Sequence, residues 1–302
     1  FFKLKNIKFD AIVGNPPYTD GSVGKSNIWH HFVLQANSAQ QSWVIPASWL
    51  RSMSSEHKRV REKFISHGIK QLKINPIDTF QTATVRTVSV VLDKNHKGPT
   101  LVVDTDETYE LALDDNDIIL LGGTTLGTNL LHRLQTQEKF KFKNNKGAKL
   151  AKKYPSVGTG TVCIFNSLSV NGLDITTITE SEGATDDEIH TDRLVVGYLP
   201  SGSNYARSFG LMEILPKNTA ILPGYYRYYP MGSTDKVIAL KSYLESKLIT
   251  FIQSMTRTSQ TLDNPQLSNI PFWIPDSVVL DEDVYAHFEL TLEEIKYVES
   301  HI

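Results

Sequence analysis

The sequence predicts an α/β fold, in which the C-terminal half of a Rossmann-like sheet is followed by a mixed α+β region. Three observations predict it. Strand and helix patterns alternate between residues 7 and 93, as they do in doubly wound sheets. The first strand is a short apolar run that ends at Gly14 and two prolines, which is typical of a buried parallel strand. Beyond Pro155 the sequence changes to short strands rich in Thr, Ser and Gly.

The elements expected in the first half are, in chain order, a strand at 7–14, a helix at 28–40, a strand at 42–45, a helix at 54–67, and strands at 69–74 and 84–92. The first helix is predicted by apolar residues at helical spacing, Ile28, Phe32 and Ala36. The last two strands lie close together with no helical period between them. We therefore expect them to pair antiparallel at a sheet edge.

The helix at 54–67 begins at Ser54-Ser55-Glu56, a pattern that favours a capped N-terminus. Its Val60 and Phe64 are spaced to point the same way. Residues 100–135 predict an additional strand pair and a short helix at 126–134.

We expect two domains, residues 1–135 and 154–302, joined by a lysine-rich linker at 136–153. The clearest helix of the second domain is predicted over 233–256, with Ser233 as its cap and Asp235 in its first turn. One apolar stripe runs along it, formed by Val237, Leu240, Leu244, Leu248, Phe251 and Met255.

Composition and charge restrict the class of protein. With 302 residues, 40% of them apolar, the chain is long enough to form two cores. No apolar run of 18 residues exists, so we expect no membrane span. The single cysteine, Cys163, excludes a disulfide framework and favours the cytoplasm. The chain begins with Phe1 rather than Met, so we expect a fragment or a processed piece.

The net charge of −2 conceals an uneven distribution of charge. Residues 56–73 and 139–153 are basic, whereas residues 276–302 are acidic. A mildly basic body of this kind would suit a surface that faces phosphates. The alternative is that each charged run is only a solvated face.

Asn15-Pro16-Pro17-Tyr18 follows the first strand, at the end where open α/β sheets bind ligands. The exocyclic amine of adenine is a poor nucleophile because its lone pair is delocalised into the ring. Asn15 Oδ1 and the Pro16 carbonyl could each accept one amine proton, which would return the lone pair to nitrogen. The prolines hold φ at about −65°, and Tyr18 offers a flat face to an extruded base. The alternative is a rigid Pro-Pro turn with a buried tyrosine.

The run from Phe9 to Tyr18 (FDAIVGNPPY) resembles the catalytic motif of amino-group DNA methyltransferases, particularly the Eco57I-like adenine-N6 enzymes of restriction–modification systems. Further blocks are similar to the family in the same order. Residues 43–50 (WVIPASWL) resemble its next strand, and Phe80 with residues 85–92 resembles its later strand pair. Three looser matches resemble its target recognition domain, at residues 156–160, 246–248 and 267–271.

The resemblance implies a site-specific enzyme that transfers a methyl group from S-adenosylmethionine to the N6 amine of an adenine flipped out of double-stranded DNA. It implies catalytic roles for Asn15, Pro16, Pro17 and Tyr18, and stacking of the base between Tyr18 and Phe80. Phe80 could equally be a core aromatic at a strand end. Cytosine-N4 enzymes share the motif, and a non-catalytic DNA-recognition subunit is a further alternative.

The chain departs from the family at the cofactor. The family's Gly-rich turn and acidic residue do not lie upstream, because only fourteen residues precede Asn15. Residues 157–161 are glycine-rich, but they lie in a β-rich context without a following amphipathic helix. We therefore expect S-adenosylmethionine to be bound mainly outside this chain, on preceding residues or on another polypeptide. We also expect this piece to be inactive alone, and a nuclease domain or subunit could accompany it.

Several other residues are candidates for contact with DNA: Lys25, Arg207, Tyr226, Arg227, Tyr228 and Arg257. Lys25 lies in a glycine-containing loop, residues 21–26, that differs from a P-loop because no strand runs directly into it. Alternating rings at 225–229 would expose one face of a strand, although core packing explains half of them. The loop residues could equally be solvated. His30 and His31 are adjacent on a helix and should face different ways, so we expect no metal site.

Overall fold

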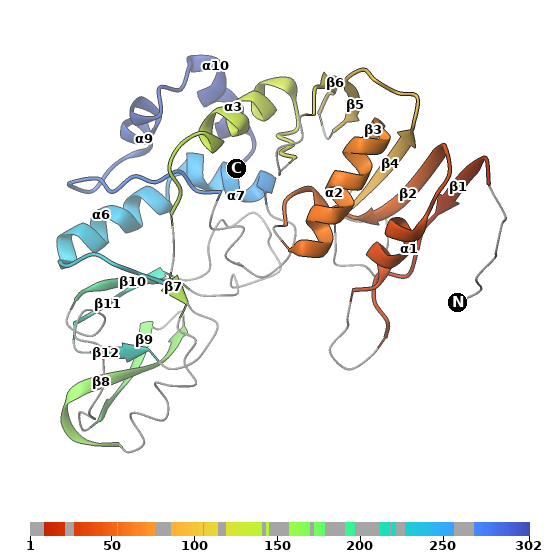
Figure 1. The fold of residues 1–302 in the computed structure, drawn as a ribbon. Helices are drawn as coiled ribbons and strands as arrows, with labels where there is room; N and C mark the ends of the chain where they lie inside the picture. Colours follow the sequence, from red (N-terminus) through yellow and green to blue (C-terminus); the bar gives the residue numbers. More distant parts are fainter. Residues whose placement is uncertain are drawn as a thin grey trace. The chain divides into compact units, whose positions relative to one another are not determined.

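The computed structural model describes residues 9–21, 27–52, 54–75, 86–104, 106–113, 119–140, 143–144, 157–169, 172–178, 191–196, 212–217, 219–221, 227–256 and 269–302 (Figure 1). The chain divides into two compact units, residues 1–132 and 133–302. The division falls inside a helix, α3, which spans Thr125–Gln135.

The first unit contains a six-stranded mixed sheet in the order β1-β2-β4-β3-β5-β6. Its strands are β1 (Ala11–Gly14), β2 (Gln40–Pro46), β3 (Ile69–Ile74), β4 (Thr87–Asp93), β5 (Thr100–Val103) and β6 (Thr108–Leu111). The strands β1 and β2 are parallel, and β4 runs antiparallel to both β2 and β3. The predicted class, the end of a Rossmann-like sheet followed by a mixed α+β region, is confirmed.

The antiparallel pairing of the last two predicted strands is confirmed, but their expected position at a sheet edge is wrong. The strand β4 inserts between β2 and β3, and β3 then pairs in parallel with β5. The hydroxyl of Thr100 also donates to the Ile69 carbonyl at 2.7 Å. The hairpin of β5 and β6 therefore provides hydrogen-bond partners for the backbone groups of β3 that would otherwise lie at an open sheet edge.

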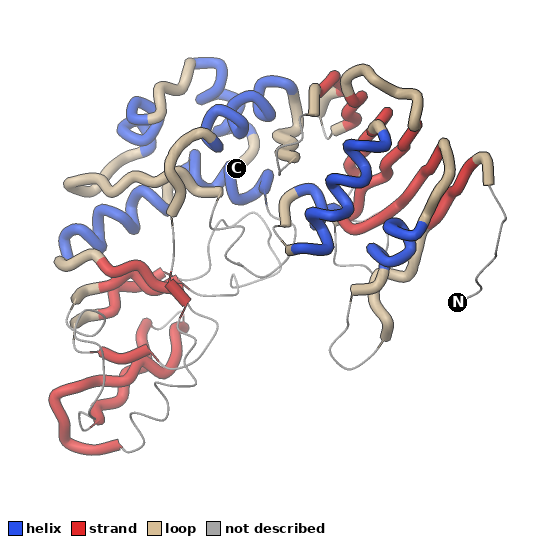
Figure 2. The backbone as a smooth tube through the Cα atoms, viewed as in Figure 1, coloured by secondary structure: helices blue, strands red, loops and turns tan. Residues whose placement is uncertain are grey.

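Two helices pack along the sheet of the first unit, α1 (Trp29–Gln35) and α2 (Ser55–His67) (Figure 2). The predicted cap of α2 is confirmed, since the Ser54 side chain accepts from the backbone N–H of His57. Val60 and Phe64 are both fully buried. A 3₁₀ turn, η1 (Ala47–Leu50), follows β2.

The first helix is shorter than predicted. It ends at Gln35, and Ala36 is already extended because the chain must turn back to begin β2 at Gln40. The ammonium of Lys63 on α2 donates to the carbonyls of Val33, Leu34 and Ala36 at 2.9, 2.9 and 2.5 Å. A side chain from another helix thus satisfies the carbonyl groups that a longer helix would have bonded internally.

The second unit contains two described sheets, in the orders β11-β10-β13-β7 and β12-β8-β9. Their strands are β7 (Lys143–Asn144), β8 (Val157–Ser169), β9 (Gly172–Ile178), β10 (Arg193–Val196), β11 (Met212–Leu215), β12 (Thr219–Ile221) and β13 (Arg227–Pro230). The helices are α6 (Thr234–Leu244), α7 (Lys247–Thr256), α9 (Asp281–His287) and α10 (Leu292–Ser300). Phe140, from the segment expected to be a linker, is buried here against Tyr229 and Phe272.

The single helix predicted over 233–256 is wrong, because the structure breaks it between α6 and α7 at Glu245 and Ser246. The carboxylate of Asp281 accepts the backbone N–H of Lys247 at 2.8 Å and so caps the new N-terminus. Most of the predicted apolar stripe is fully buried, and only Met255 is half-buried. Ser233 occupies the cap position of α6, but its side chain makes no capping hydrogen bond.

Candidate functional site

The Asn15–Tyr18 turn directly follows the last residue of β1, Gly14. Because β1 and β2 are parallel, this turn and η1 lie at the same edge of the sheet. The antiparallel β4 starts at that edge, since its first residue Thr87 pairs with Pro46. The end of β3 also lies there, where Ile74 pairs with Val88. The ends of β1, β2 and β3 and the start of β4 therefore lie at the same edge of the sheet as the turn.

Burial alternates along the turn. Asn15 and Pro17 are exposed, Pro16 is buried and Tyr18 is half-buried against the core of the sheet. Burial raises the pKa of the Tyr18 phenol, so the ring is neutral at physiological pH. The buried proline and tyrosine hold the turn in place, while the Asn15 side chain stays accessible to a ligand.

Gly14 brings the turn close to Trp43 of β2. A Cβ atom at Gly14 would lie 2.5 Å from Cζ3 of Trp43. The indole is 5% exposed, and its Nε1 donates to Gln41 Oε1 at 3.0 Å. The ring is therefore held, and only glycine permits this approach.

The residues that follow the turn are held to the residues just before α1. The backbone N–H of Ile28 donates to the Tyr18 carbonyl at 3.2 Å, and Thr19 forms an antiparallel bridge with Asn27. These two contacts join residues 18–19 to residues 27–28 beside the motif. Lys25, one of the predicted DNA contacts, lies outside the described residues.

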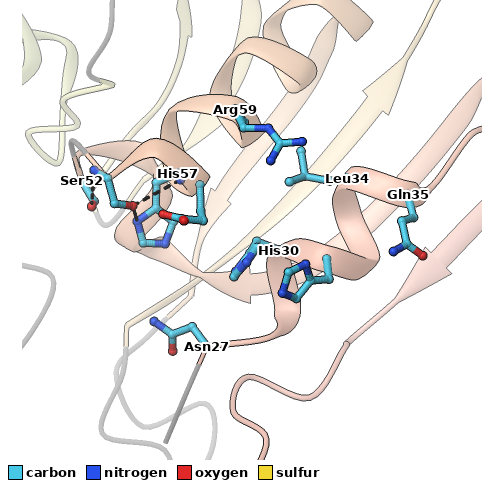
Figure 3. Close-up of a pocket in the computed structure, with 10 residues that line it drawn as sticks. Asn27, His30, Leu34, Gln35, Ser52, His57 and Arg59 are labelled. Atoms are coloured by element: carbon cyan, nitrogen blue, oxygen red, sulfur yellow. Dashed lines mark hydrogen bonds between the residues drawn. The ribbon is translucent and has the colours of Figure 1, made fainter. Parts of the chain in front are cut away.

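A cavity of about 670 Å³ lies along α1 and beside the N-terminal end of α2 (Figure 3). Its lining includes Asn27, His30, His31, Ser54, Glu56 and Arg59. The cavity is polar, and one of its lining residues, Asn27, is bridged to Thr19, the residue after Tyr18.

His57 also lines this cavity, and it is buried and fully bonded. Its Nε2 lies 3.3 Å from the Ser48 hydroxyl and its Nδ1 lies 3.0 Å from the Ser54 hydroxyl. Burial, and then the nearby His30, lower the pKa of His57 to about 4. The imidazole is therefore neutral at pH 7, with one nitrogen donating and the other accepting.

His30 and His31 differ in burial, as side chains on different faces of a helix do, but their rings lie close together. Their ring centroids are 4.2 Å apart, although His30 is buried and His31 is exposed. Burial, followed by the nearby His31, lowers the pKa of His30. Among the residues that the structure describes, no group of three His, Cys, Asp or Glu side chains is arranged to hold a metal ion.

Most of the predicted DNA contacts and one predicted wall of the base pocket lie outside the described residues: Lys25, Phe80, Arg207, Tyr226 and Arg257. Arg227 and Tyr228 belong to β13, where their backbones pair with Val196 and Val195 of β10. Of the predicted site, the structure thus describes the Asn15–Tyr18 turn. Sequence analysis missed the convergence of His30, Ser48 and His57, because no spacing connects residues on separate elements.

The described residues do not by themselves fit S-adenosylmethionine. Within the described ranges, no glycine-rich turn connects a strand to a helix, and the strand that ends in glycine, β1, leads into the Asn15–Tyr18 turn. In the described part of the chain, no helix is long and apolar enough to cross a membrane.

Comparison with known proteins supports the resemblance. No family profile matches the chain. An uncharacterized adenine-specific methylase of Mycoplasma pneumoniae is 30% identical over 111 residues, which cover 32% of this chain and 26% of that protein. The chain is similar to the adenine-specific methylases. It spans about a quarter of the length of the curated methylase that it matches.

Solved structures of restriction–modification proteins are also similar to this chain. The Type IIL enzyme MmeI, solved with DNA, matches 89% of this chain and 45% of its own, with 10% identity and a TM-score of 0.43. The type IIG restriction endonuclease BpuSI matches 97% and 53%, with 12% identity and a TM-score of 0.34. A type I methyltransferase subunit from Streptococcus thermophilus matches 43% and 32%, with 16% identity and a TM-score of 0.28.

Proposed function

We propose that this chain forms the target-base side of a DNA methyltransferase of a restriction–modification system, which methylates the N6 amine of a flipped adenine. The observation that carries the proposal is the Asn15–Tyr18 turn at the carboxyl edge of β1, with an exposed Asn15 between a buried Pro16 and the tightly packed Gly14. The similarity to an adenine-specific methylase supports it. The proposal concerns the whole protein, of which this chain supplies one part.

The turn would activate the amine by accepting its protons. Asn15 Oδ1 accepts one N–H and the Pro16 carbonyl accepts the other, so that the nitrogen moves towards tetrahedral geometry and its lone pair leaves the ring. Neither proline has an N–H that could compete, and each fixes its own φ. The acceptors are therefore positioned before the base arrives, which is where electrostatic catalysis gains most.

Tyr18 would stack on the extruded base. Its ring is half-buried against the sheet core, so little side-chain entropy is lost when a base stacks on it. Phe80 would provide the opposite wall. Extrusion is necessary because an amine inside a duplex cannot be reached by the catalytic groups.

S-adenosylmethionine supplies an electrophilic methyl group when bound, and we propose that residues outside this chain hold it. The second unit would read the DNA, with Arg207, Tyr226, Arg227, Tyr228 and Arg257 as candidate contacts and Lys25 of the first unit near a phosphate.

The test replaces Asn15 in the intact protein that carries this chain. We expect Asn15→Ala to lower the rate of methyl transfer to DNA about 100-fold or more, comparable to the loss of one positioned hydrogen-bonding group from an oxyanion hole. Binding of DNA should change little. Asn95→Ala, in an exposed turn after β4, is the matched control and should keep the parent rate.

Each outcome distinguishes the alternatives. An unchanged transfer rate in Asn15→Ala would remove the catalytic role. N4-methylcytosine in the nucleoside digest, in place of N6-methyladenine, would assign the activity to cytosine. An intact protein that binds a specific site but transfers no methyl group would be a recognition subunit.

A further inference from the structure

Two adjacent histidines, His30 and His31, line the cavity of about 670 Å³ along α1. Arg59 of α2 lines the same space, and Figure 3 shows the side chains of the two helices around it. The rings of His30 and His31 are 4.2 Å apart, and His30 is 8% exposed whereas His31 is exposed. The cavity therefore brings three basic side chains from two helices to one space.

Most polar groups of the lining can donate hydrogen bonds. The guanidinium of Arg59 only donates, and the amides of Asn27 and Gln35 and the hydroxyl of Ser52 each carry at least one donor. The cavity also lies at the N-terminal end of α2, a helix of 13 residues, where the helix dipole favours a negative charge. Together these features favour a negatively charged ligand with several acceptor oxygens.

The charge of the histidines depends on the groups around them. Burial, and then His31, lower the pKa of His30, while Glu56 raises it and Arg59 lowers it. The carboxylate of Glu56 accepts a hydrogen bond from its own backbone N–H, which lowers its pKa. His57, the third histidine of the lining, is neutral because it is buried. His30 is therefore also neutral at pH 7, and a negative ligand in the cavity would favour its protonation.

The cavity is connected to the Asn15–Tyr18 turn. Asn27 of its lining forms a bridge with Thr19. The next residue, Ile28, donates its backbone N–H to the Tyr18 carbonyl at 3.2 Å. A nucleotide that is extruded from a duplex stays joined to its strand through a phosphate on each side, so a protein that binds the base also has to accommodate a phosphate close to it.

We propose that His30, His31 and Arg59 bind a phosphodiester of the substrate DNA next to the target base, and that the histidine pair takes up a proton from solvent on binding. This rests on the proposed function. The planar guanidinium of Arg59 suits two oxygens of a phosphate, and a protonated imidazole donates to a further oxygen. Because a proton is taken up, binding of DNA strengthens as the pH falls.

The first experiment compares Arg59→Gln with Lys58→Gln in the intact protein. The two residues are adjacent and exposed on α2, but only Arg59 lines the cavity. Binding of a fluorescein-labelled duplex is measured by anisotropy over a series of KCl concentrations. We expect Arg59→Gln to reduce the slope of log K against log [KCl] by about 1, and Lys58→Gln to keep the parent slope. Equal slopes in the two variants would overturn the contact with phosphate.

The second experiment measures the same binding at constant KCl between about pH 6 and pH 8, around the ordinary histidine pKa of about 6.5. Uptake of one proton strengthens binding by up to about tenfold for each unit by which the pH falls. We expect this dependence in the parent, and a weaker one in His30→Gln and His31→Gln. His96→Gln, in the turn after β4, is the control and should match the parent. Because His31 is exposed, its variant tests the proposal even where His30→Gln does not fold.

Modified DNA identifies the source of the phosphate. A duplex with a neutral methylphosphonate on the correct side of the target adenine should bind the parent without the dependence on pH. An unchanged dependence with methylphosphonate on either side would overturn the DNA site, and so would a pH dependence in His31→Gln equal to that of His96→Gln. Neither result would alter the outcome for Asn15→Ala. A parent that binds no DNA would overturn both proposals.

Discussion

At the scale of single residues, Gly14 and the motif that follows it depend on one another. The glycine is at the end of a strand, has no unusual φ, and is required only because Trp43 occupies the space of a side chain. Trp43 cannot withdraw, since its indole is buried and bonded to Gln41. The position of Asn15 relative to β2 thus depends on the absence of one carbon atom.

We expect Gly14→Ala to destabilise the protein by about 1–3 kcal/mol, the usual cost of overpacking a core. The measurement is the free energy of unfolding from urea titration. Gly98→Ala is the control, because a Cβ there would meet only His96, at an ordinary 3.5 Å. Equal stability of the two variants would show that the contact with Trp43 relaxes freely.

His57 gives the stability of the protein a dependence on pH. Its pKa is lowered to about 4 in the folded state, whereas an unfolded histidine titrates at about 6.5. Between these values the unfolded chain binds more protons, so the free energy of unfolding falls as the pH drops from 6.5 towards 4. Above pH 6.5 this contribution is fully present.

We expect His57→Gln to reduce the acid dependence of stability between about pH 4 and pH 6.5, by an amount on the order of 3 kcal/mol at most. Urea unfolding of parent and variant at several pH values measures it. His30 and Arg61 lower the pKa of His57, and Glu56 raises it, so the effect belongs to this cluster. Parallel pH curves for parent and variant would contradict the prediction.

At the scale of elements, the length of α1 is set by its neighbour. The ammonium of Lys63 on α2 binds three carbonyls around the C-terminus of α1. A positive charge at this end also interacts favourably with the helix dipole. The contact fixes where α1 stops, and therefore where β2 begins.

We expect Lys63→Met to cost about 2 kcal/mol of stability, because hydrogen bonds to a charged group are lost and buried carbonyls lose a partner. Lys58→Met, on the exposed side of the same helix, is the control and should be close to neutral. Thermal and urea unfolding compare the two. Equal losses in both variants would mean that the contact of Lys63 contributes nothing specific.

The elements of the second unit show a similar dependence on partners. The apolar stripe from Val237 to Phe251 is continuous in sequence, yet the helix breaks at Ser246, where Asp281 caps the next segment from a distant part of the chain. Arg133 likewise binds Glu294 with two hydrogen bonds of 2.9 Å at the start of α10. The local sequence pattern predicts which face of a helix is buried, whereas a contact with a residue far away in the sequence determines where the helix begins or ends.

At the scale of the whole molecule, each unit has its own buried residues and its own sheets. The net charge of −2 gives no general attraction to DNA, so the proposed DNA binding would rely on local groups of basic residues. The acidic residues of 276–302 lie in and around α9 and α10. The proposed methyltransferase therefore depends on where charge is placed rather than on its sum.

Much of the fold was predictable because periodicity is a local property. The strand at 69–74, the capped helix at 54–67 and the pair of strands after residue 100 follow from spacing and capping alone, and the structure confirms them. The insertion of β4 between β2 and β3 was not predictable, because pairing partners are chosen among strands far apart in the sequence.

The sequence by itself determined the Asn15-Pro16-Pro17-Tyr18 turn, its place after an apolar strand, and the similarity to the adenine-specific methylases, since all of these depend on adjacent residues. Only the tertiary structure decided that Gly14 packs on Trp43 and that His57 is neutral. These features arise from burial and from contacts between separate elements, and neither leaves a pattern in the order of the residues.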